Sequence, residues 1–343
     1  MTVSTQVRLA RRPEGEPGDD TYEFVEHELP AVGDGQVLLR VVYLSLDPYM
    51  RGRMSDAPSY ADPVEVGDVM VGGTVCVVEE SRNPEWAAGD LVLSYSGWQT
   101  HAISDGRGLR RLDPRLAPVS TALGVMGMPG FTAYAGLLEI GRPQPGETVV
   151  VAAATGPVGS AVGQIAKVKG ARAVGIAGGP EKRQALLDEF GFDVALDHRS
   201  PTFAADLEAA VPDGIDVYFE NVGGPVSREA FKRMNLYGRV PVCGLVASYN
   251  ATSPPQGPDS LPPFMSLILT RSLTIRGFIQ GEFTKSHGRA FVRDMSSWLT
   301  DGSVRYREDV VEGLHAAPAA FRGLLAGRNF GKLLVRVSEG PTL

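Results

Sequence analysis

From about residue 149 onward, short apolar runs alternate with segments whose apolar residues recur at helical spacing. Unbroken apolar runs of this length are typical of strands that are buried on both faces. The runs predict strands at Val149–Ala153, Ala173–Ala177, Val194–Asp197, Asp216–Glu220, Val240–Gly244 and Leu273–Phe278. The segments between and after them predict helices at Ser160–Lys169, Glu181–Phe190, Thr202–Ala210, Arg228–Asn235, Phe264–Arg271 and Lys285–Thr300. This alternation predicts an α/β fold with a parallel, doubly wound sheet.

The first part of the chain follows a different pattern. Runs with strand composition are separated there by Gly, Pro and Asp, and helical spacing appears only from about Gly124 onward. These runs are 37–45, 73–79 and 90–95. We therefore expect a small, partly closed sheet domain at the N-terminus. The tail carries a helix near Ala316–Ala326 and an apolar strand at Lys332–Val337, which is expected to return to the N-terminal sheet.

A glycine-rich turn joins the strand at Val149–Ala153 to the helix that follows it. The turn has the pattern Ala154-x-Gly156-x-x-Gly159, which is a nucleotide-binding fingerprint when it lies between a strand and a helix. Glycine permits a tight turn and lets the backbone approach a bulky ligand, and the start of the helix offers N–H groups to a pyrophosphate. The alternative is a glycine-rich turn that binds no ligand.

The end of the next strand indicates which dinucleotide would bind. An NAD site usually has an Asp or Glu there, whose carboxylate accepts hydrogen bonds from the ribose hydroxyls. This chain has Ala177-Gly178-Gly179 instead, and Lys182 and Arg183 follow. Small residues leave room for a 2′-phosphate and the two cations can pair with it, so NADP is favoured over NAD. In the alternative interpretation, Lys182 and Arg183 are solvated residues at the start of a helix.

Composition agrees with a protein of two ordinary domains. The chain has 343 residues, of which 43% are apolar and 21% charged, as in soluble globular proteins. Its net charge of −7 disfavours nucleic acid or an anionic membrane as a general partner. The sequence carries only Cys76 and Cys243, and we expect no secretory signal and no transmembrane segment, so a reducing, cytoplasmic location is predicted.

The inventory of reactive side chains disfavours several kinds of chemistry. The histidines are scattered and the two cysteines lie far apart, so no stretch has the spacing of a metal site. A metal held by residues distant in sequence is the remaining alternative. No Ser lies in a Gly-x-Ser-x-Gly turn. Hydride transfer, in which a cofactor does the difficult chemistry, is the most economical hypothesis.

Several motifs, spread over nearly the whole chain, resemble one family when they are taken together. They are Leu44-Ser-Leu-Asp-Pro-Tyr-Met-Arg-Gly52, Met128-Pro-Gly-Phe-Thr-Ala-Tyr134, Tyr218-x-x-Asn-Val-Gly-Gly224, Cys243-Gly-x-x-x-Ser-Tyr-Asn250 and Asn329-x-Gly-Lys332, with the glycine fingerprint. This set resembles the zinc-independent medium-chain dehydrogenase/reductases, in the branch of leukotriene dehydrogenase/prostaglandin reductase and curcumin reductase. Zinc-dependent relatives carry a Gly-His-Glu motif, whereas the similar place here reads Val66-Gly67-Asp68-Val69.

The resemblance implies a GroES-like catalytic domain at 1–124, completed by 306–343, and a Rossmann domain at 125–305 that binds NADP(H). It implies NADPH-dependent reduction of the carbon–carbon double bond of an α,β-unsaturated ketone or aldehyde, with hydride added to the β-carbon. Relatives are often dimers, so a homodimer is expected. A quinone reductase of the same superfamily and a non-enzymatic NADPH sensor are the alternatives. The natural substrate and the face of hydride transfer stay open.

Carried over by position, the resemblance gives a set of cofactor contacts. They are Thr132, Gly156, Pro157, Val158, Gly159, Lys182, His198, Asn221, Cys243, Gly244, Ser248, Tyr249, Phe278 and Asn329. Lys182 would bind the 2′-phosphate, the role that the charge pattern also gives it. Family members often have Tyr where this chain has His198, although an imidazole or Arg199 could still reach a phosphate. No metal ligand is implied.

On the substrate side, the resemblance points to Tyr49, Tyr60 and Met128. Each tyrosine could instead be an ordinary buried aromatic, and Met128 could be core. The hydroxyl of Tyr249 is the expected donor to the substrate carbonyl oxygen, where negative charge develops. The alternative is that Tyr249 only packs against nicotinamide. The loop at 250–263 is rich in Pro, Ser and Gly, and a long loop of this kind is often functional, for example as a lid.

Overall fold

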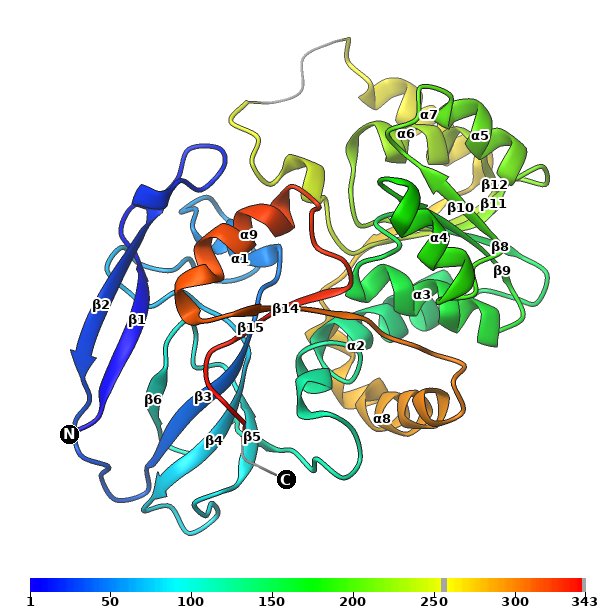
Figure 1. Ribbon diagram of the computed structural model, residues 1–343. Coiled ribbons are helices and arrows are strands. Elements are labelled where there is room, and N and C mark those ends of the chain that lie inside the picture. The colour runs from blue at the N-terminus through cyan, green and yellow to red at the C-terminus, as the bar shows by residue number, and fades with distance from the viewer. Residues whose placement is uncertain (254–257, 341–343) are drawn as a thin grey trace. The chain divides into compact units, whose positions relative to one another are not determined.

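The computed structural model describes residues 1–253 and 258–340 (Figure 1). The chain forms two compact units, one made of residues 1–124 and 308–343 and the other of residues 125–307. The glycine fingerprint lies in the second unit. Part of the expected loop at 250–263, residues 254–257, lies outside the described residues.

The strands of the second unit form a parallel sheet in the order β10-β9-β8-β11-β12-β13. They are β8 (Thr148–Val151), β9 (Arg172–Ala177), β10 (Val194–Asp197), β11 (Ile215–Phe219), β12 (Met234–Val242) and β13 (Thr274–Gly277). From β8 the chain runs outward to β10 and then returns to add β11, β12 and β13 on the other side. The predicted α/β class with a doubly wound sheet is confirmed. In such sheets ligands bind beyond the carboxyl ends of the strands, where the order reverses, here between β8 and β11.

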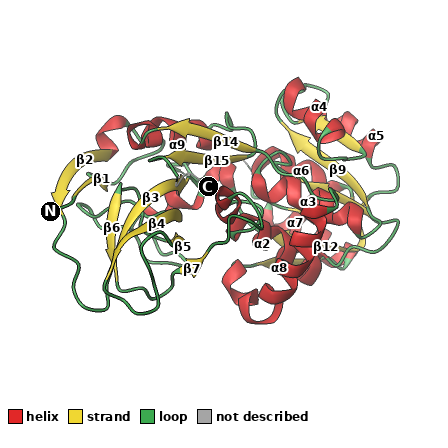
Figure 2. Ribbon diagram, turned by 60° about the horizontal axis from the view of Figure 1, so that its bottom comes forward, coloured by secondary structure: helices red, strands yellow, loops and turns green. Residues whose placement is uncertain are grey.

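Helices accompany this sheet, and Figure 2 shows them gathered beside its strands, whereas strands predominate in the other unit. They are α2 (Met128–Ala135), α3 (Pro157–Val168), α4 (Pro180–Asp188), α5 (Phe203–Ala210), α6 (Gly224–Lys232), α7 (Leu261–Arg271) and α8 (Thr284–Thr300). The helix expected at 228–235 starts earlier, because Pro225 suits the first turn of α6, and its expected end belongs to β12. Likewise α7 begins at Leu261 with Pro262 in its first turn, so the end of the expected loop is helical.

Apolar side chains explain why β8 lies at the centre of its unit. Val149, Val150 and Val151 are fully buried, as expected for a strand covered on both faces. Val162 and Ile165 of α3 are fully buried as well. Burial of each such side chain stabilises the fold by about 1.5–3 kcal/mol. The strand and the helix therefore hold the glycine turn between them in a fixed place.

The first unit is built mainly of strands. One sheet has the order β14-β15-β3-β4-β5-β7, with β6 also paired to β3, and β1 and β2 form a separate antiparallel pair. The strands are β1 (Val3–Leu9), β2 (Tyr22–Glu28), β3 (Val37–Ser45), β4 (Thr74–Ser81), β5 (Leu91–Ser94), β6 (His101–Ser104), β7 (Arg110–Arg111), β14 (Glu308–Glu312) and β15 (Lys332–Arg336), and the helices are α1 (Tyr49–Arg53) and α9 (Ala317–Leu325). Strand β15 pairs with β3, Leu334 opposite Ser45, so the expected return of the tail strand is confirmed.

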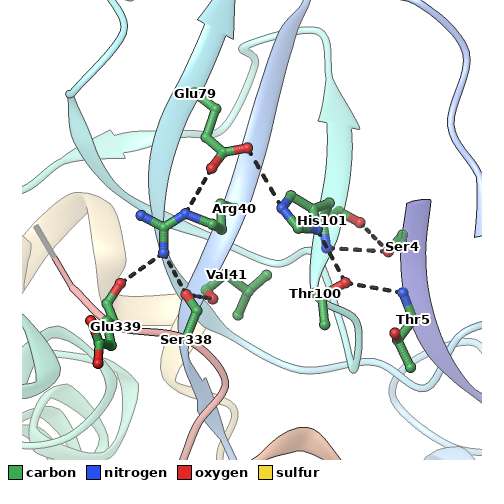
Figure 3. A network of polar contacts seen from close by, with 9 residues as sticks. All are labelled: Ser4, Thr5, Arg40, Val41, Glu79, Thr100, His101, Ser338 and Glu339. Atoms are coloured by element: carbon green, nitrogen blue, oxygen red, sulfur yellow. Dashed lines mark hydrogen bonds and ion pairs between the residues drawn. The ribbon is translucent and has the colours of Figure 1, made fainter. Parts of the chain in front are cut away.

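A polar network attaches both β1 and the tail to this sheet (Figure 3). Arg40 on β3 lies 2.7 Å from Glu79 on β4 and donates a hydrogen bond to the hydroxyl of Ser338, which follows β15. Glu79 also lies 3.5 Å from Nε2 of His101 on β6, whose carbonyl accepts a hydrogen bond from Ser4 on β1. Burial lowers the pKa of His101, against the opposing charge of Glu79. Side chains as well as strand pairing therefore hold the two segments on the sheet.

Candidate functional site

The turn after β8 brings the start of α3 against the ends of the strands. The N–H of Gly156 donates to the carbonyl of Ala153 (3.0 Å), and the N–H of Ser160 donates to the carbonyl of Gly156 (2.9 Å). A Cβ on Gly159 would overlap the carbonyl oxygen of Ala153, so this close approach requires glycine. The first N–H groups of a helix have no intrahelical acceptor, and here they include those of Val158 and Gly159. The turn can therefore hold an anion such as a pyrophosphate.

Ala154 occupies the slot where the fingerprint usually has its first glycine. Gly175 on β9, the partner of Val151, also approaches it, since a Cβ on Gly175 would lie 3.0 Å from the methyl carbon of Ala154. The N–H of Ala154 donates to the carbonyl of Ile176 (2.9 Å), so the turn keeps its contact with β9. Gly175 thus leaves room for the methyl group of Ala154, the residue that replaces the usual first glycine of the fingerprint.

Basic side chains gather at the ends of β9 and β10. A Cβ on Gly178 would lie 2.8 Å from Nε of Arg199 and 2.9 Å from the ring of His198, so both side chains lie over this glycine. Asp197 accepts hydrogen bonds from the N–H groups of Gly179 (3.1 Å) and Arg199 (2.9 Å). Burial raises the pKa of Asp197, but these N–H groups and the neighbouring positive charge lower it below its ordinary value overall. The carboxylate of Asp197 is therefore bonded to the backbone.

Lys182 lies half-buried in the first turn of α4, soon after the glycines. The side chain of Arg183 lies elsewhere, against β10, where its Nε donates to the carbonyl of Ala195 at 3.1 Å. Lys182, His198 and Arg199 thus lie on the segments that follow β9 and β10. Cations on these segments can pair with a phosphate group, and Gly178, which has no side chain, leaves space for one between them.

A buried carboxylate, which is not among the functional residues predicted from the sequence, lies at the end of β11. Glu220 is 2% exposed. Its Oε1 accepts hydrogen bonds from the N–H groups of Val222 (2.7 Å) and Gly223 (2.9 Å) and from the hydroxyl of Tyr218 (3.2 Å). The hydroxyl of Ser227 on α6 donates to Oε2. A buried acid needs such donors, so an acid between a buried strand and a glycine pair is the signal that could have indicated it.

The segment after β12 is attached to the end of β11. The N–H groups of Cys243 and Gly244 both donate to the carbonyl of Glu220, at 2.9 and 3.2 Å. The side-chain amide of Asn221 donates to the carbonyl of Ala152 at the end of β8 (2.8 Å). Burial and the nearby charge of Glu220 raise the pKa of the Cys243 thiol to about 12. These bonds bring Asn221, Cys243 and Gly244 together beside the glycine turn.

Tyr249 follows this segment, after the short 3-10 turn at Val246–Ser248. Its hydroxyl oxygen lies 3.1 Å from the place that a Cβ on Gly244 would occupy, and the carbonyl oxygen of Asn221 lies 3.5 Å from the same place. The side chain of Tyr249 is half-buried, whereas Ser248 is exposed. A phenol hydroxyl can donate a hydrogen bond, so a donor lies at the carboxyl ends of β11 and β12.

Met128 and Thr132 lie on α2 of the same unit. The hydroxyl of Thr132 donates to the carbonyl of Met128 (2.7 Å), which leaves the lone pairs of the hydroxyl as acceptors. Phe278, which follows β13, is buried, and its ring meets that of Phe219 edge-on at a centroid distance of 6.3 Å. The side chain of Phe278 thus packs in the core, and its expected cofactor contact stays a prediction.

Three of the expected site residues belong to the first unit. Tyr49 begins α1, and burial together with the charge of Asp47 raises the pKa of its phenol well above the ordinary value. Tyr60 is 63% exposed. The side-chain amide of Asn329 donates to the carbonyl of Gly331 (2.8 Å). The roles of Tyr49 and Tyr60 toward a substrate, and of Asn329 toward a cofactor, stay predictions.

A buried ion pair connects the segments that carry Tyr49 and Asn329. Lys332 on β15 is 2% exposed, and its Nζ lies 2.7 Å from both the carbonyl oxygen of Leu46 and Oδ1 of Asp47. Burial lowers the pKa of Lys332, while the charge of Asp47 raises it. Removal of one partner from a buried pair typically costs about 3–5 kcal/mol. The pair therefore holds the start of α1 against the start of β15.

Two further features concern metals and membranes. Among the residues that the structure describes, no group of three or more His, Cys, Asp and Glu side chains is arranged to hold a metal ion. Over those same ranges, no helix has the length and apolar character needed to cross a bilayer. Both cysteines are free thiols, and Cys76 is buried on β4.

Known proteins resemble this chain over nearly its whole length. Residues 5–112 match the family described as the N-terminal domain of oxidoreductase, and residues 157–297 match the family described as zinc-binding dehydrogenase. The NADPH-dependent curcumin reductase of Escherichia coli (strain K12) is 53% identical, over 96% of each chain. Prostaglandin reductase 1 of Rattus norvegicus is 42% identical, over 96% of this chain and 97% of the relative. The crystal structure of CurA in complex with NADPH from Vibrio vulnificus covers 98% of this chain and 99% of its own, with 51% identity and a TM-score of 0.95.

Proposed function

This chain belongs to the zinc-independent medium-chain dehydrogenase/reductases, in the branch of NADPH-dependent enone and alkenal reductases, and we propose that it adds hydride to the β-carbon of its substrate. It is an oxidoreductase that uses NADP(H) and reduces the carbon–carbon double bonds of small α,β-unsaturated carbonyl compounds. When bound, NADPH supplies the hydride. The residues of the chain bind and orient the two reactants.

The residues at the ends of the parallel sheet fit a phosphorylated dinucleotide. The overlap that a Cβ on Gly159 would cause supports a pyrophosphate at the start of α3, and we assign this role to Gly156, Pro157, Val158 and Gly159. Lys182 is proposed to bind the 2′-phosphate, with His198 and Arg199 beside it. The other proposed cofactor contacts are Thr132, Asn221, Cys243, Gly244, Ser248, Tyr249, Phe278 and Asn329.

One observation supports the mechanism above all: the hydroxyl of Tyr249 lies over Gly244, at the carboxyl ends of β11 and β12. Addition of hydride to the β-carbon leaves negative charge on the carbonyl oxygen of the substrate. A donor held at that oxygen lowers the barrier, and loss of one such donor typically costs about 10²–10³ in rate. We assign this role to Tyr249. The α-carbon then takes a proton from solvent, or through the same hydroxyl.

Tyr49, Tyr60 and Met128 are proposed to line the substrate side. Burial and Asp47 move the pKa of Tyr49 further above neutral pH, and a neutral phenol can donate a hydrogen bond without presenting a charge. An aromatic ring and a thioether both pack well on flat apolar groups. Such a lining favours enones that carry aryl or alkyl substituents.

A substrate screen tests this function. The purified protein is incubated with NADPH and, in turn, with aliphatic enals, aryl enones, oxo-fatty acids and quinones, and NADPH oxidation is followed by absorbance. We expect saturated carbonyl products, identified by mass spectrometry, in a one-to-one ratio with the NADPH consumed. Oxidation of NADPH with quinones alone would make the protein a quinone reductase. Tight NADPH binding without turnover of any compound would make it a sensor.

We also propose that the protein is a homodimer, formed through the edge of the parallel sheet. Strand β13 ends the order of that sheet, and α7 packs on β12 next to it. Helix α7 is apolar, yet all its residues are at least partly exposed, and Leu269 is 79% exposed. A strand edge beside an exposed apolar helix suits a second copy of the chain. Light scattering should give twice the chain mass of 36.6 kDa, and Leu269→Glu should give the single mass. A monomeric parent would contradict the proposal.

A further inference from the structure

Three successive carbonyl groups, those of residues 220–222, hold the turn that leads to Tyr249. The first accepts hydrogen bonds from the two residues that follow β12, as described above. The second accepts from the N–H of Val246 (3.3 Å) and the third from the N–H of Ala247 (2.9 Å). The conformation of the turn therefore depends on that of the loop after β11. Tyr249 comes two residues after Ala247, the last residue of the turn that is bonded to this loop.

The shape of that loop depends in turn on the side chain of Glu220. The carboxylate reaches over its own loop, and one oxygen accepts from the N–H groups of Val222 (2.7 Å) and Gly223 (2.9 Å). Ser227 on α6 donates to the other oxygen, which ties the loop to the helix that follows. Gly223 has a φ of 81°, so the backbone bends sharply under the carboxylate. A single buried side chain thus sets the direction of the three carbonyl groups.

We propose that Glu220 is a positioning residue for the reaction and acts through the hydroxyl of Tyr249. Its carboxylate fixes the carbonyls of residues 220–222, these fix the turn at 243–247, and the turn places Tyr249 over Gly244. The inference rests on the donor role of Tyr249 proposed above. It adds a residue that needs to touch neither substrate nor cofactor.

Two substitutions separate the reach of this side chain from its charge. Glu220→Asp keeps the charge but shortens the side chain by one C–C bond, about 1.5 Å, so the carboxylate can no longer serve both N–H groups. Glu220→Gln keeps the reach, because its oxygen can accept from the same N–H groups while its amide donates to Ser227. Glu147→Asp is the matched control. Glu147 directly precedes the amino end of β8, whereas Glu220 follows the carboxyl end of β11. Glu147 accepts from the N–H of Gln144 (2.8 Å) and pairs with Arg239.

Turnover at saturating NADPH and enone gives the first readout. Glu220→Asp should lower kcat about 100-fold, the scale for a reacting group misplaced by about 1 Å. Glu220→Gln should stay close to the parent, and so should Glu147→Asp. If Glu220→Gln lost as much as Glu220→Asp, the charge would matter rather than the reach, and the positioning role would be overturned.

A double-mutant cycle with Tyr249→Phe tests the route of the effect. If Glu220 acts through the hydroxyl, Glu220→Asp costs little once the hydroxyl is gone, and the two losses are far from additive. The same loss in both backgrounds would overturn the inference. Parental kcat in Tyr249→Phe alone would instead refute the donor role itself, so the two failures can be told apart.

Binding gives a readout without turnover. Glu220→Asp should bind adenosine 2′,5′-bisphosphate and NADPH about as tightly as the parent does, because the adenosine end, which this substitution leaves unchanged, decides the affinity for both ligands. Equal weakening of the binding of both ligands would indicate a general loss of structure and would overturn the inference.

Thermal unfolding checks the fold of each variant. If Glu220→Asp does not fold, Ser227→Ala takes its place in the cycle, because it removes only the donor to the second oxygen, and the same tests of additivity apply.

Discussion

The two ends of the proposed nucleotide site are built differently. At the adenosine end, His198 and Arg199 are exposed and lie over Gly178, and Lys182 is half-buried. At the reaction end, Glu220 is almost completely buried, and backbone hydrogen bonds fix its surroundings. Exposed charges attract an anion but are screened by salt, whereas buried hydrogen bonds define geometry. We infer that the first end decides which cofactor binds and how tightly, and that the second decides how fast hydride is transferred.

Each end also has an acid directly at a strand end, and the comparison of these acids is instructive. Asp197 at the end of β10 and Glu220 after β11 each accept hydrogen bonds from two backbone N–H groups. An acid that accepts from ribose hydroxyls favours NAD. Asp197 instead accepts from Gly179 and Arg199, beside the basic side chains. Both acids therefore shape loops, and the adenosine end keeps its cationic character.

The largest effect is expected from a change at the reaction end. Tyr249→Phe removes only a hydroxyl, so kcat should fall by about 10²–10³ while the ring continues to pack. The Kd for NADPH should stay near that of the parent. Steady-state kinetics with a saturating enone measure the first quantity, and fluorescence titration the second. A rate within roughly threefold of the parent would show that this end supplies no donor.

A smaller effect, on binding alone, is expected at the adenosine end. Lys182→Ala should weaken NADPH roughly 10- to 150-fold, the range for a lost hydrogen bond to a charged group, and should leave NADH unchanged. Added salt should reduce the difference. Titrations at low and high salt measure both effects. Arg183→Ala is the matched control and should matter less, because its Nε is bonded to the carbonyl of Ala195. Equal weakening of NADPH and NADH by Lys182→Ala would contradict this division.

A milder test adds one methyl group at the adenosine end. In Gly178→Ala the new Cβ would lie 2.8–2.9 Å from Arg199 and His198, but both side chains are exposed and can move aside. The fold should survive, and NADPH affinity should fall only severalfold because the cations shift. The kcat at saturating NADPH should equal that of the parent. A clear loss of kcat would mean that the two ends are not independent.

We expect that an enal substrate does not alkylate the two thiols of the folded protein at neutral pH. Burial raises the pKa of Cys243 to about 12 and that of Cys76 to about 11. The thiolate is the reactive form, so alkylation by an enal should be slow at neutral pH and should speed up as the pH rises toward these values. Intact mass after incubation with an enal, without NADPH, should show no adduct until the protein is unfolded. An adduct on folded Cys243 would show that the reaction end is open.

Much of the nucleotide-binding fold can be predicted because its signals are local. The strand expected at Ala173–Ala177 is observed as β9 at Arg172–Ala177, and the one expected at Val194–Asp197 is observed unchanged as β10. Strands that are buried on both faces appear in the sequence as unbroken apolar runs, so they can be recognised without knowing which strands they pair with. The glycine fingerprint is also local, since Gly159 contacts a residue only six positions earlier, Ala153.

The features that escape prediction depend on partners distant in the chain. Strand β2 is mostly exposed and rich in charge, so no apolar pattern marks it, and it is a strand because it pairs with β1. Every residue of helix α2 from Pro129 to Ala135 is buried, so the helix lacks the polar face by which an amphipathic helix is predicted. The acid before a glycine pair could have indicated that Glu220 is buried, but its positioning role depends on the turn after β12, whose N–H groups donate to the loop after β11. The spacing around Glu220 does not show which turn that loop holds.

The most direct test is a stopped-flow measurement of hydride transfer in the parent, Lys182→Ala and Tyr249→Phe, with excess enone and a range of NADPH concentrations. We predict that Lys182→Ala reaches the parental plateau rate but needs more NADPH to do so. Tyr249→Phe should keep the parental half-saturation and reach a plateau lower by about 10²–10³. If either variant changed the plateau and the half-saturation together, the two ends would act as one site, and the division between affinity and rate would be wrong.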